Sequence, residues 1–190
     1  MVHPNFCIKL IMDAFEQIVG LLLENDKYWV RHSVKVNLTK EEKVKINKPS
    51  TPRPEIDIVA YDVVQNILFL LEAKSYLDSG GVVYEKVVEE NKFPKGRYKI
   101  LTSKLYQETI VSRLKNDWIS IDLINKKIKF SFGLIAGNIY KNKEEELIKH
   151  FNKNGWFFWG PTIIKQKLIE LSKKGYENST ITIVTKLMTK

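Results

Sequence analysis

Charged side chains interrupt two of the most apolar, strand-like segments of this chain. Asp57 lies within residues 55–62, and Glu72 and Lys74 lie within residues 67–75. A charge in apolar surroundings is costly unless it has a partner, so these three side chains are expected to interact. Since side chains alternate along a strand, Glu72 and Lys74 point to the same face. The two segments predict a β-hairpin that turns around residues 64–66.

The residue types of this hairpin indicate a chemistry. Two carboxylates brought together repel each other, and a divalent cation removes that repulsion. Asp57, Glu72 and Lys74 together with a metal ion are groups that can hydrolyse a phosphodiester. The alternative is a cross-strand network of salt bridges without catalytic function.

The hydrophobic periodicity predicts one mixed α/β domain over residues 1–190, in which helices flank a mixed β-sheet. We expect an αβββαβ core followed by a C-terminal αβαβ-type extension. Polar, proline-rich residues 39–54 and the long segment 76–101 are expected to be loops. The expected helices are 6–24, 103–116 (capped by Ser103), 143–152 and 161–174, and the expected strands are 28–38, 55–62, 67–75, 128–140, 155–160 and 180–188.

Composition restricts the setting and the partner. The net charge of +9 favours a polyanion such as DNA, although ordinary solvated lysines are the alternative. Cys7 is the only cysteine, which excludes an internal disulfide and a cysteine-based zinc site. The apolar runs are too short to span a bilayer, and the N-terminus has no signal-peptide order. We therefore expect a soluble cytoplasmic protein without a membrane partner or a small-molecule cofactor.

These residues resemble the signature of the PD-(D/E)XK nuclease superfamily, which has the restriction-endonuclease-like fold. The signature places an acid on the second core strand, here Asp57, and Glu/Asp-x-Lys on the third, here Glu72-Ala73-Lys74. The resemblance covers about residues 6–140. It departs from the pattern in that two residues separate Pro54 from Asp57. A Gln-x-x-x-Tyr element of some subgroups is half present, because Gln107 is followed by Val111.

The resemblance implies a metal-dependent endonuclease that acts on DNA, in restriction, defence or repair. Mg²⁺, with Mn²⁺ as a substitute, would be held by Asp57, Glu72 and the Ala73 carbonyl, while Lys74 orients or deprotonates the attacking water. Glu16 on the first helix and Gln107 are further catalytic candidates, each with a surface position as its alternative. One such site cuts one strand, so a double-strand break would suggest a homodimer or two sequential nicks.

Basic residues of the segment 76–101 are expected to face DNA, with a solvated mobile loop as the alternative. These residues are Lys86, Lys92, Lys95, Arg97 and Lys99. The aromatic run 156–159 predicts a packed strand, or else a surface that stacks on bases or forms a dimer. The alternative function for the whole chain is a non-catalytic module that binds nucleic acid or a protein partner.

Overall fold

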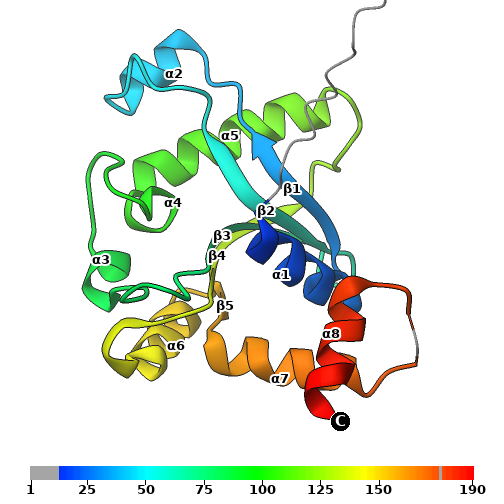
Figure 1. Cartoon of the computed structure of the whole chain (residues 1–190). Helices are drawn as coiled ribbons and strands as arrows, with labels where there is room; N and C mark the ends of the chain where they lie inside the picture. The colour runs from blue at the N-terminus through cyan, green and yellow to red at the C-terminus, as the bar shows by residue number, and fades with distance from the viewer. Residues whose placement is uncertain (1–12, 176) are drawn as a thin grey trace, which may run out of the picture.

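The computed structural model describes residues 13–175 and 177–190. Its centre is a five-stranded sheet in the order β1-β2-β3-β4-β5 (Figure 1). β2 runs antiparallel to both β1 and β3, whereas β4 runs parallel to both β3 and β5. The strands are β1 (Trp29–Lys35), β2 (Glu55–Asp62), β3 (Ile67–Lys74), β4 (Lys129–Ala136) and β5 (Phe157–Trp159).

Helices cover both faces of the sheet, so the chain is a mixed α/β fold as predicted. α1 and α7 contribute to one apolar cluster, and α3, α4, α5 and α6 contribute to the other. The helices are α1 (Ala14–Asn25), α2 (Lys40–Lys45), α3 (Tyr84–Val88), α4 (Lys99–Thr102), α5 (Lys104–Ile119), α6 (Glu144–Lys153), α7 (Pro161–Ser172) and α8 (Thr180–Thr189), with a 3₁₀ turn at Tyr140–Asn142. No helix among the described residues is long and apolar enough to cross a membrane.

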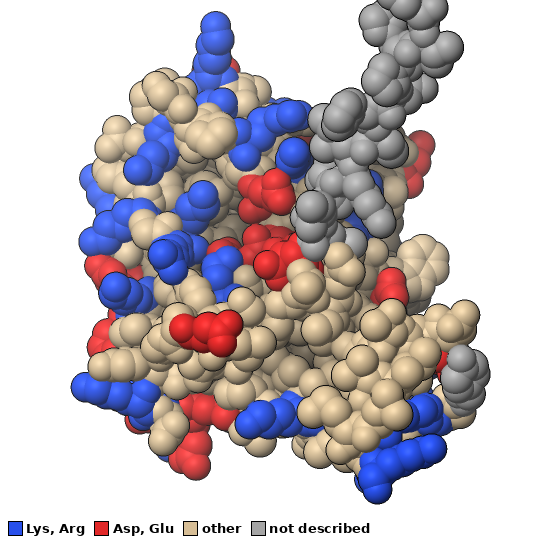
Figure 2. Space-filling model, viewed as in Figure 1, with Lys and Arg blue, Asp and Glu red and all other residues tan. Residues whose placement is uncertain are grey.

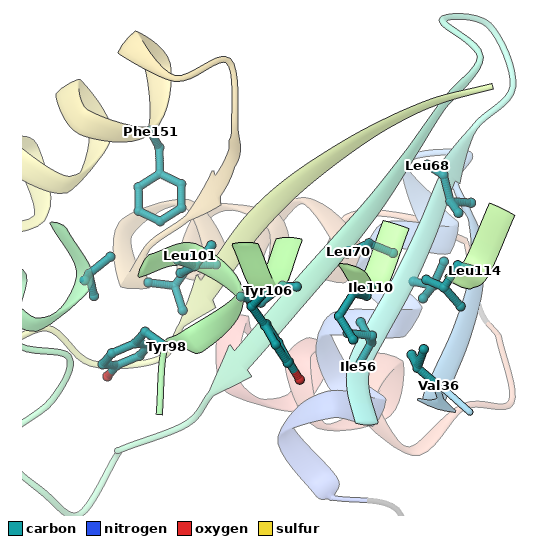
Figure 3. Close-up of a cluster of buried hydrophobic side chains, with 14 of the residues drawn as sticks. Val36, Ile56, Leu68, Leu70, Tyr98, Leu101, Tyr106, Ile110, Leu114 and Phe151 are labelled. Atoms are coloured by element: carbon teal, nitrogen blue, oxygen red, sulfur yellow. The ribbon is translucent and has the colours of Figure 1, made fainter. Parts of the chain in front are cut away.

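The cluster beneath α5 is the larger of the two apolar clusters of the core. Tyr106, Ile110 and Leu114 recur at helical spacing and are at most 2% exposed. They face strand residues such as Ile56 and Leu70 (Figure 3). Burial of this stripe fixes α5 against the β2–β3 hairpin.

Several sequence predictions are confirmed. The hairpin strands have nearly the predicted bounds, and the Ser103 hydroxyl accepts the Tyr106 N–H at the start of α5. The aromatic run forms β5, where Phe157 and Phe158 pack against opposite clusters. The first helix begins at Ala14 after the N-cap Asp13, and residues 6–12 of the predicted helix lie outside the described residues.

The predicted strand at 180–188 is wrong, because these residues form α8. The β-branched sequence favours a strand, but the segment packs against α7 with Thr182 and Thr185 buried one turn apart. The Thr185 hydroxyl donates to the Ile181 carbonyl 2.9 Å away, which satisfies it within the helix. The C-terminal extension is therefore a helix, a short strand and two further helices.

The predicted loops at 39–54 and 76–101 contain helices. Residues 36–54 form an arm that projects beyond the sheet and carries α2 (Figure 1). A capping box joins Thr39 and Glu42 at the start of α2. The Arg113 guanidinium of α5 donates to both Glu42 oxygens, from Nη2 at 2.9 Å and from Nε at 3.0 Å. The second loop contains α3 and α4.

The arm depends on this forked contact, so Arg113→Ala is expected to lower the free energy of unfolding by about 1 kcal/mol, since the pair is largely shielded from water. Protease cleavage within 40–50 is expected to become faster. Asp117→Ala removes only the exposed partner of Arg113 and serves as the control, with an expected change below about 0.5 kcal/mol. Urea denaturation and limited proteolysis measure both effects. Unchanged cleavage in Arg113→Ala would contradict this anchoring.

Candidate functional site

β2 loses its regular alternation at Asp57. Ile56 belongs to the cluster under α5, whereas Ile58, two residues later, belongs to the cluster under α1. In a regular strand both would face the same side. The pairing with β1 skips Ser33, whose φ is 51°, and the pairing with β3 ends at Ile58–Leu71. Asp57 therefore lies where the sheet opens.

The Asp57 carboxylate replaces the missing ladder contact. The Ala73 N–H donates to Asp57 Oδ2 at 2.9 Å. Lys74 Nζ donates to the same oxygen at 3.0 Å. These bonds join the ends of β2 and β3 through a side chain and fix the orientation of the carboxylate.

The Lys74 ammonium is the centre of the site. It lies 2.7 Å from Glu72 Oε1, 3.0 Å from Asp57 Oδ2 and 3.0 Å from the Ala73 carbonyl oxygen. The three side chains are only 16–20% exposed. The predicted cross-strand network is therefore present. The oxygens that the sequence assigned to a metal ion also converge on one cationic atom.

The electrostatics of these groups are coupled. Burial raises the pKa of Glu72, Asp57 raises it further, and Lys74 opposes both. Burial alone would lower the pKa of Lys74, but the charges of Glu72 and Asp57 outweigh it and raise that pKa. With both acids ionised, one ammonium leaves an excess negative charge, and the site favours an additional cation.

Glu16 approaches this site from α1. Burial, and then the charge of Asp57, raises the pKa of Glu16 to about 7, and Lys74 partly opposes the shift. Glu16 therefore lies close enough to respond to the charges of Asp57 and Lys74. Its position on the first turn of α1 is fixed by Asp13, whose carboxylate accepts the Glu16 N–H.

A cavity of about 540 Å³ opens in front of the acids, and we call it the site cavity. The end of the arm forms one wall, and the segment after β3 forms the other. Its lining residues are Thr51, Pro52, Arg53, Pro54, Glu55, Asp57, Glu72, Lys74, Tyr76, Gly96, Arg97 and Lys99. Sequence reasoning missed Arg53 and Tyr76. The signal for Arg53 was its position in the proline-rich segment directly before β2.

Two tyrosines lie close to Glu72 on the α5 side. Burial and the Glu72 charge raise the pKa of Tyr106, and its hydroxyl has no hydrogen-bond partner among the described residues. In Figure 3 this hydroxyl points away from α5, past Ile56. Burial, contact with Tyr76 and the Glu72 charge raise the pKa of Tyr98. Both phenols therefore stay neutral beside the acids.

Gln107 and Lys92 do not line the site cavity. The Gln107 amide donates to the carbonyls of Ile100 and Leu101, at 2.9 and 3.4 Å. It supports α4, which places Lys99 close enough to act on the Glu72 charge. Gln107 thus holds a neighbour of the site instead of contacting the acids.

The predicted basic residues divide among three cavities. Arg97 and Lys99 line the site cavity. Lys86 and Lys95 line a second cavity beside it. Lys92 lies at a third cavity, together with Gln107. The predicted nucleic-acid-facing set is therefore only partly gathered at the acids.

No group of three or more His, Cys, Asp or Glu side chains in the described part of the chain is arranged to hold a metal ion. The site offers two carboxylates and a backbone carbonyl, with Glu16 nearby. Comparison with protein-family models, curated proteins and solved structures gave no match. Geometry and residue chemistry are thus the support for a functional proposal.

The raised pKa of Glu16 predicts a pH-dependent stability. The folded state retains this proton up to about pH 7, whereas the unfolded chain releases it near the ordinary value. The contribution of Glu16 to the free energy of unfolding is therefore fully present below the pKa of the unfolded state. It is lost as the pH rises through about 7. In EDTA, Glu16→Gln is expected to be more stable than wild type by about 1 kcal/mol at pH 8, a value reduced for solvent screening, and equal at pH 4.5.

Urea denaturation at both pH values measures this difference. Glu24→Gln, which changes an exposed glutamate of the same helix, is the control and is expected to match wild type. A Glu16→Gln variant with the same pH profile as wild type would contradict the assignment.

Removal of the Lys74 ammonium leaves two buried carboxylates facing each other. Lys74→Met is expected to lower the free energy of unfolding by about 3 kcal/mol at pH 8. The loss is expected to be smaller at pH 5, where the carboxylates take up a proton. Mn²⁺ is expected to restore part of the loss by replacing the ammonium charge. Lys167→Met, which removes a similarly shielded lysine paired with Asp26, is the control that Mn²⁺ does not restore. Equal effects of Mn²⁺ on both variants would contradict a cation position at these oxygens.

Proposed function

We propose that this chain is a metal-dependent phosphodiester hydrolase that acts on DNA. The observation that carries the proposal is the convergence of Asp57, Glu72 and the Ala73 carbonyl on one cation position, occupied by the Lys74 ammonium. Oxygen ligands of this kind suit Mg²⁺ and Mn²⁺. The excess negative charge of the two carboxylates further favours a divalent cation.

Binding of such a cation requires the Lys74 side chain to move away from these oxygens. The metal would polarise the scissile phosphate and acidify a bound water. Lys74, displaced but still at the edge of the site cavity, is then placed to orient that water and to offset charge on the phosphorane. Glu16, whose pKa is raised to about 7, would exchange a proton with groups of the site.

The surroundings of the acids suit a phosphate backbone. Arg53, Arg97 and Lys99 line the same cavity as Asp57 and Glu72. Figure 2 shows basic side chains beside and above a central group of acidic side chains on the face that it views. In this arrangement basic side chains that can bind phosphates surround the carboxylates that would bind a metal. The basic side chains attract a polyanion despite the local negative charge of the carboxylates.

The order of elements supports the resemblance to the PD-(D/E)XK nucleases. A helix precedes β1, β2 and β3, and α5 and β4 follow, which is the αβββαβ order of that core. α2, α3 and α4 are additions between these elements. We extend the proposal to an endonuclease of this superfamily, with a restriction, defence or repair role. A homodimer would bring two such sites to the two strands of a duplex.

One observation favours the alternative of a non-catalytic module that binds nucleic acid or protein. The Lys74 ammonium has three N–H donors, and three oxygens within the chain accept them. Such a satisfied network also explains why charges persist at the end of β3. Activity with a metal separates the two functions.

Incubation with supercoiled plasmid and Mg²⁺ or Mn²⁺ is expected to yield nicked and linear products, detected by gel electrophoresis. Asp57→Asn is expected to lower the rate by about 10²-fold or more, because it removes a ligand charge. Asp62→Asn changes a carboxylate at the other end of the same strand and is the matched control, with a rate within about twofold of wild type.

If the wild-type protein leaves every substrate intact, the proposed nuclease function is contradicted. The non-catalytic binding module is then the remaining function. Equal activity of Asp57→Asn and wild type would show that another site performs the cleavage.

A further inference from the structure

A second cavity of about 580 Å³ opens beside the site cavity, and we call it the adjoining cavity. It lies within the segment that follows β3, between α3 and α4. Tyr76, Gly96 and Arg97 line both cavities, so they form the wall that the two share. A ligand that extends over these three residues can therefore occupy both cavities at once.

Basic groups dominate the adjoining cavity. Lys86, Lys95 and Arg97 line it, and Glu89 is its one acid among the described residues. Glu89 pairs with Lys95 at 2.8 Å, but this pair is 46–63% exposed, and solvent weakens such pairs. Arg97 donates to the Tyr76 hydroxyl at 2.8 Å. A guanidinium has five donors, so this bond leaves others for a phosphate.

The cavity also offers groups suited to a nucleobase. Tyr76 supplies a partly exposed aromatic ring, and the Arg97 guanidinium lies 5.8 Å from the centroid of that ring. Rings and guanidinium planes of this kind stack on unpaired bases.

We propose that the adjoining cavity binds one unpaired nucleotide of the strand whose phosphodiester lies at Asp57 and Glu72. The inference rests on the proposed nuclease function and adds its substrate class. A pocket of this volume accepts a ligand of nucleotide size, whereas a base within an intact duplex cannot enter without leaving its stack. The preferred substrate is therefore single-stranded DNA, or a duplex with an unpaired segment at the cleavage position.

Equilibrium binding in EDTA tests the inference without cleavage. Fluorescence anisotropy compares a labelled single strand with a blunt duplex of the same sequence, and wild type is expected to bind the single strand more tightly. Ser79→Trp places a large ring at the exposed edge of the cavity. It is expected to weaken single-strand binding by about tenfold or more, the loss of one stacked base, and duplex binding by less than about twofold.

Ser120→Trp is the matched control, because Ser120 is also exposed and also donates to a nearby carbonyl. It is expected to change neither affinity. A second pair tests charge. Lys86→Glu in the cavity is expected to weaken single-strand binding selectively, whereas Lys165→Glu on α7 is expected to affect both substrates equally and weakly.

Equal affinity of wild type for both substrates, or an equal loss on both in Ser79→Trp, would overturn the inference. The outcome is independent of cleavage. Selective single-strand binding without hydrolysis in Mg²⁺ would contradict only the proposed nuclease function. Hydrolysis without this selectivity would contradict only the nucleotide cavity.

Discussion

The Lys74 ammonium holds together the end of the sheet at which β2 and β3 separate. It contacts a carboxylate from each strand and the Ala73 carbonyl at 2.7–3.0 Å, and without it two shielded negative charges would face each other. The backbone follows this constraint, because the β2–β3 ladder stops beside Asp57 and a side-chain bond to the Ala73 N–H takes its place. The same oxygens are the ones that a divalent cation would use. One local network therefore stabilises the strand ends and provides the proposed chemistry.

The rest of the fold surrounds this network with groups of opposite charge. α5 is fixed by its buried stripe and reaches the arm through Arg113 and Glu42. The end of the arm supplies Arg53 to the site cavity, and the segment after β3 supplies Arg97 and Lys99. Both segments are insertions between strands of the sheet, and each is tied to the core by buried residues such as Ile46 and Ile100. We infer that the sheet positions the two carboxylates and Lys74, and that these two segments position the basic groups around them.

The sequence predicted the contact between the three charged groups better than their surroundings. Asp57, Glu72 and Lys74 stood out because charges are costly in apolar strands, and the period of two placed Glu72 and Lys74 on one face. The break in alternation at Asp57 could not be predicted, because it depends on where two neighbouring strands stop pairing. Gln107 had a suitable residue type and position for the site, but its side-chain amide donates to the Ile100 carbonyl of α4 instead. The strand predicted at 180–188 failed because packing against α7 outweighed the β-branched propensity.

A crystal structure with Mn²⁺ tests the central claim most directly, because anomalous scattering locates this ion without reference to activity. The account predicts one Mn²⁺ bound by Asp57, Glu72 and the Ala73 carbonyl, with the Lys74 ammonium withdrawn from these oxygens into the site cavity. A structure at saturating Mn²⁺ in which Lys74 still bridges both carboxylates, with no ion at this position, would contradict it.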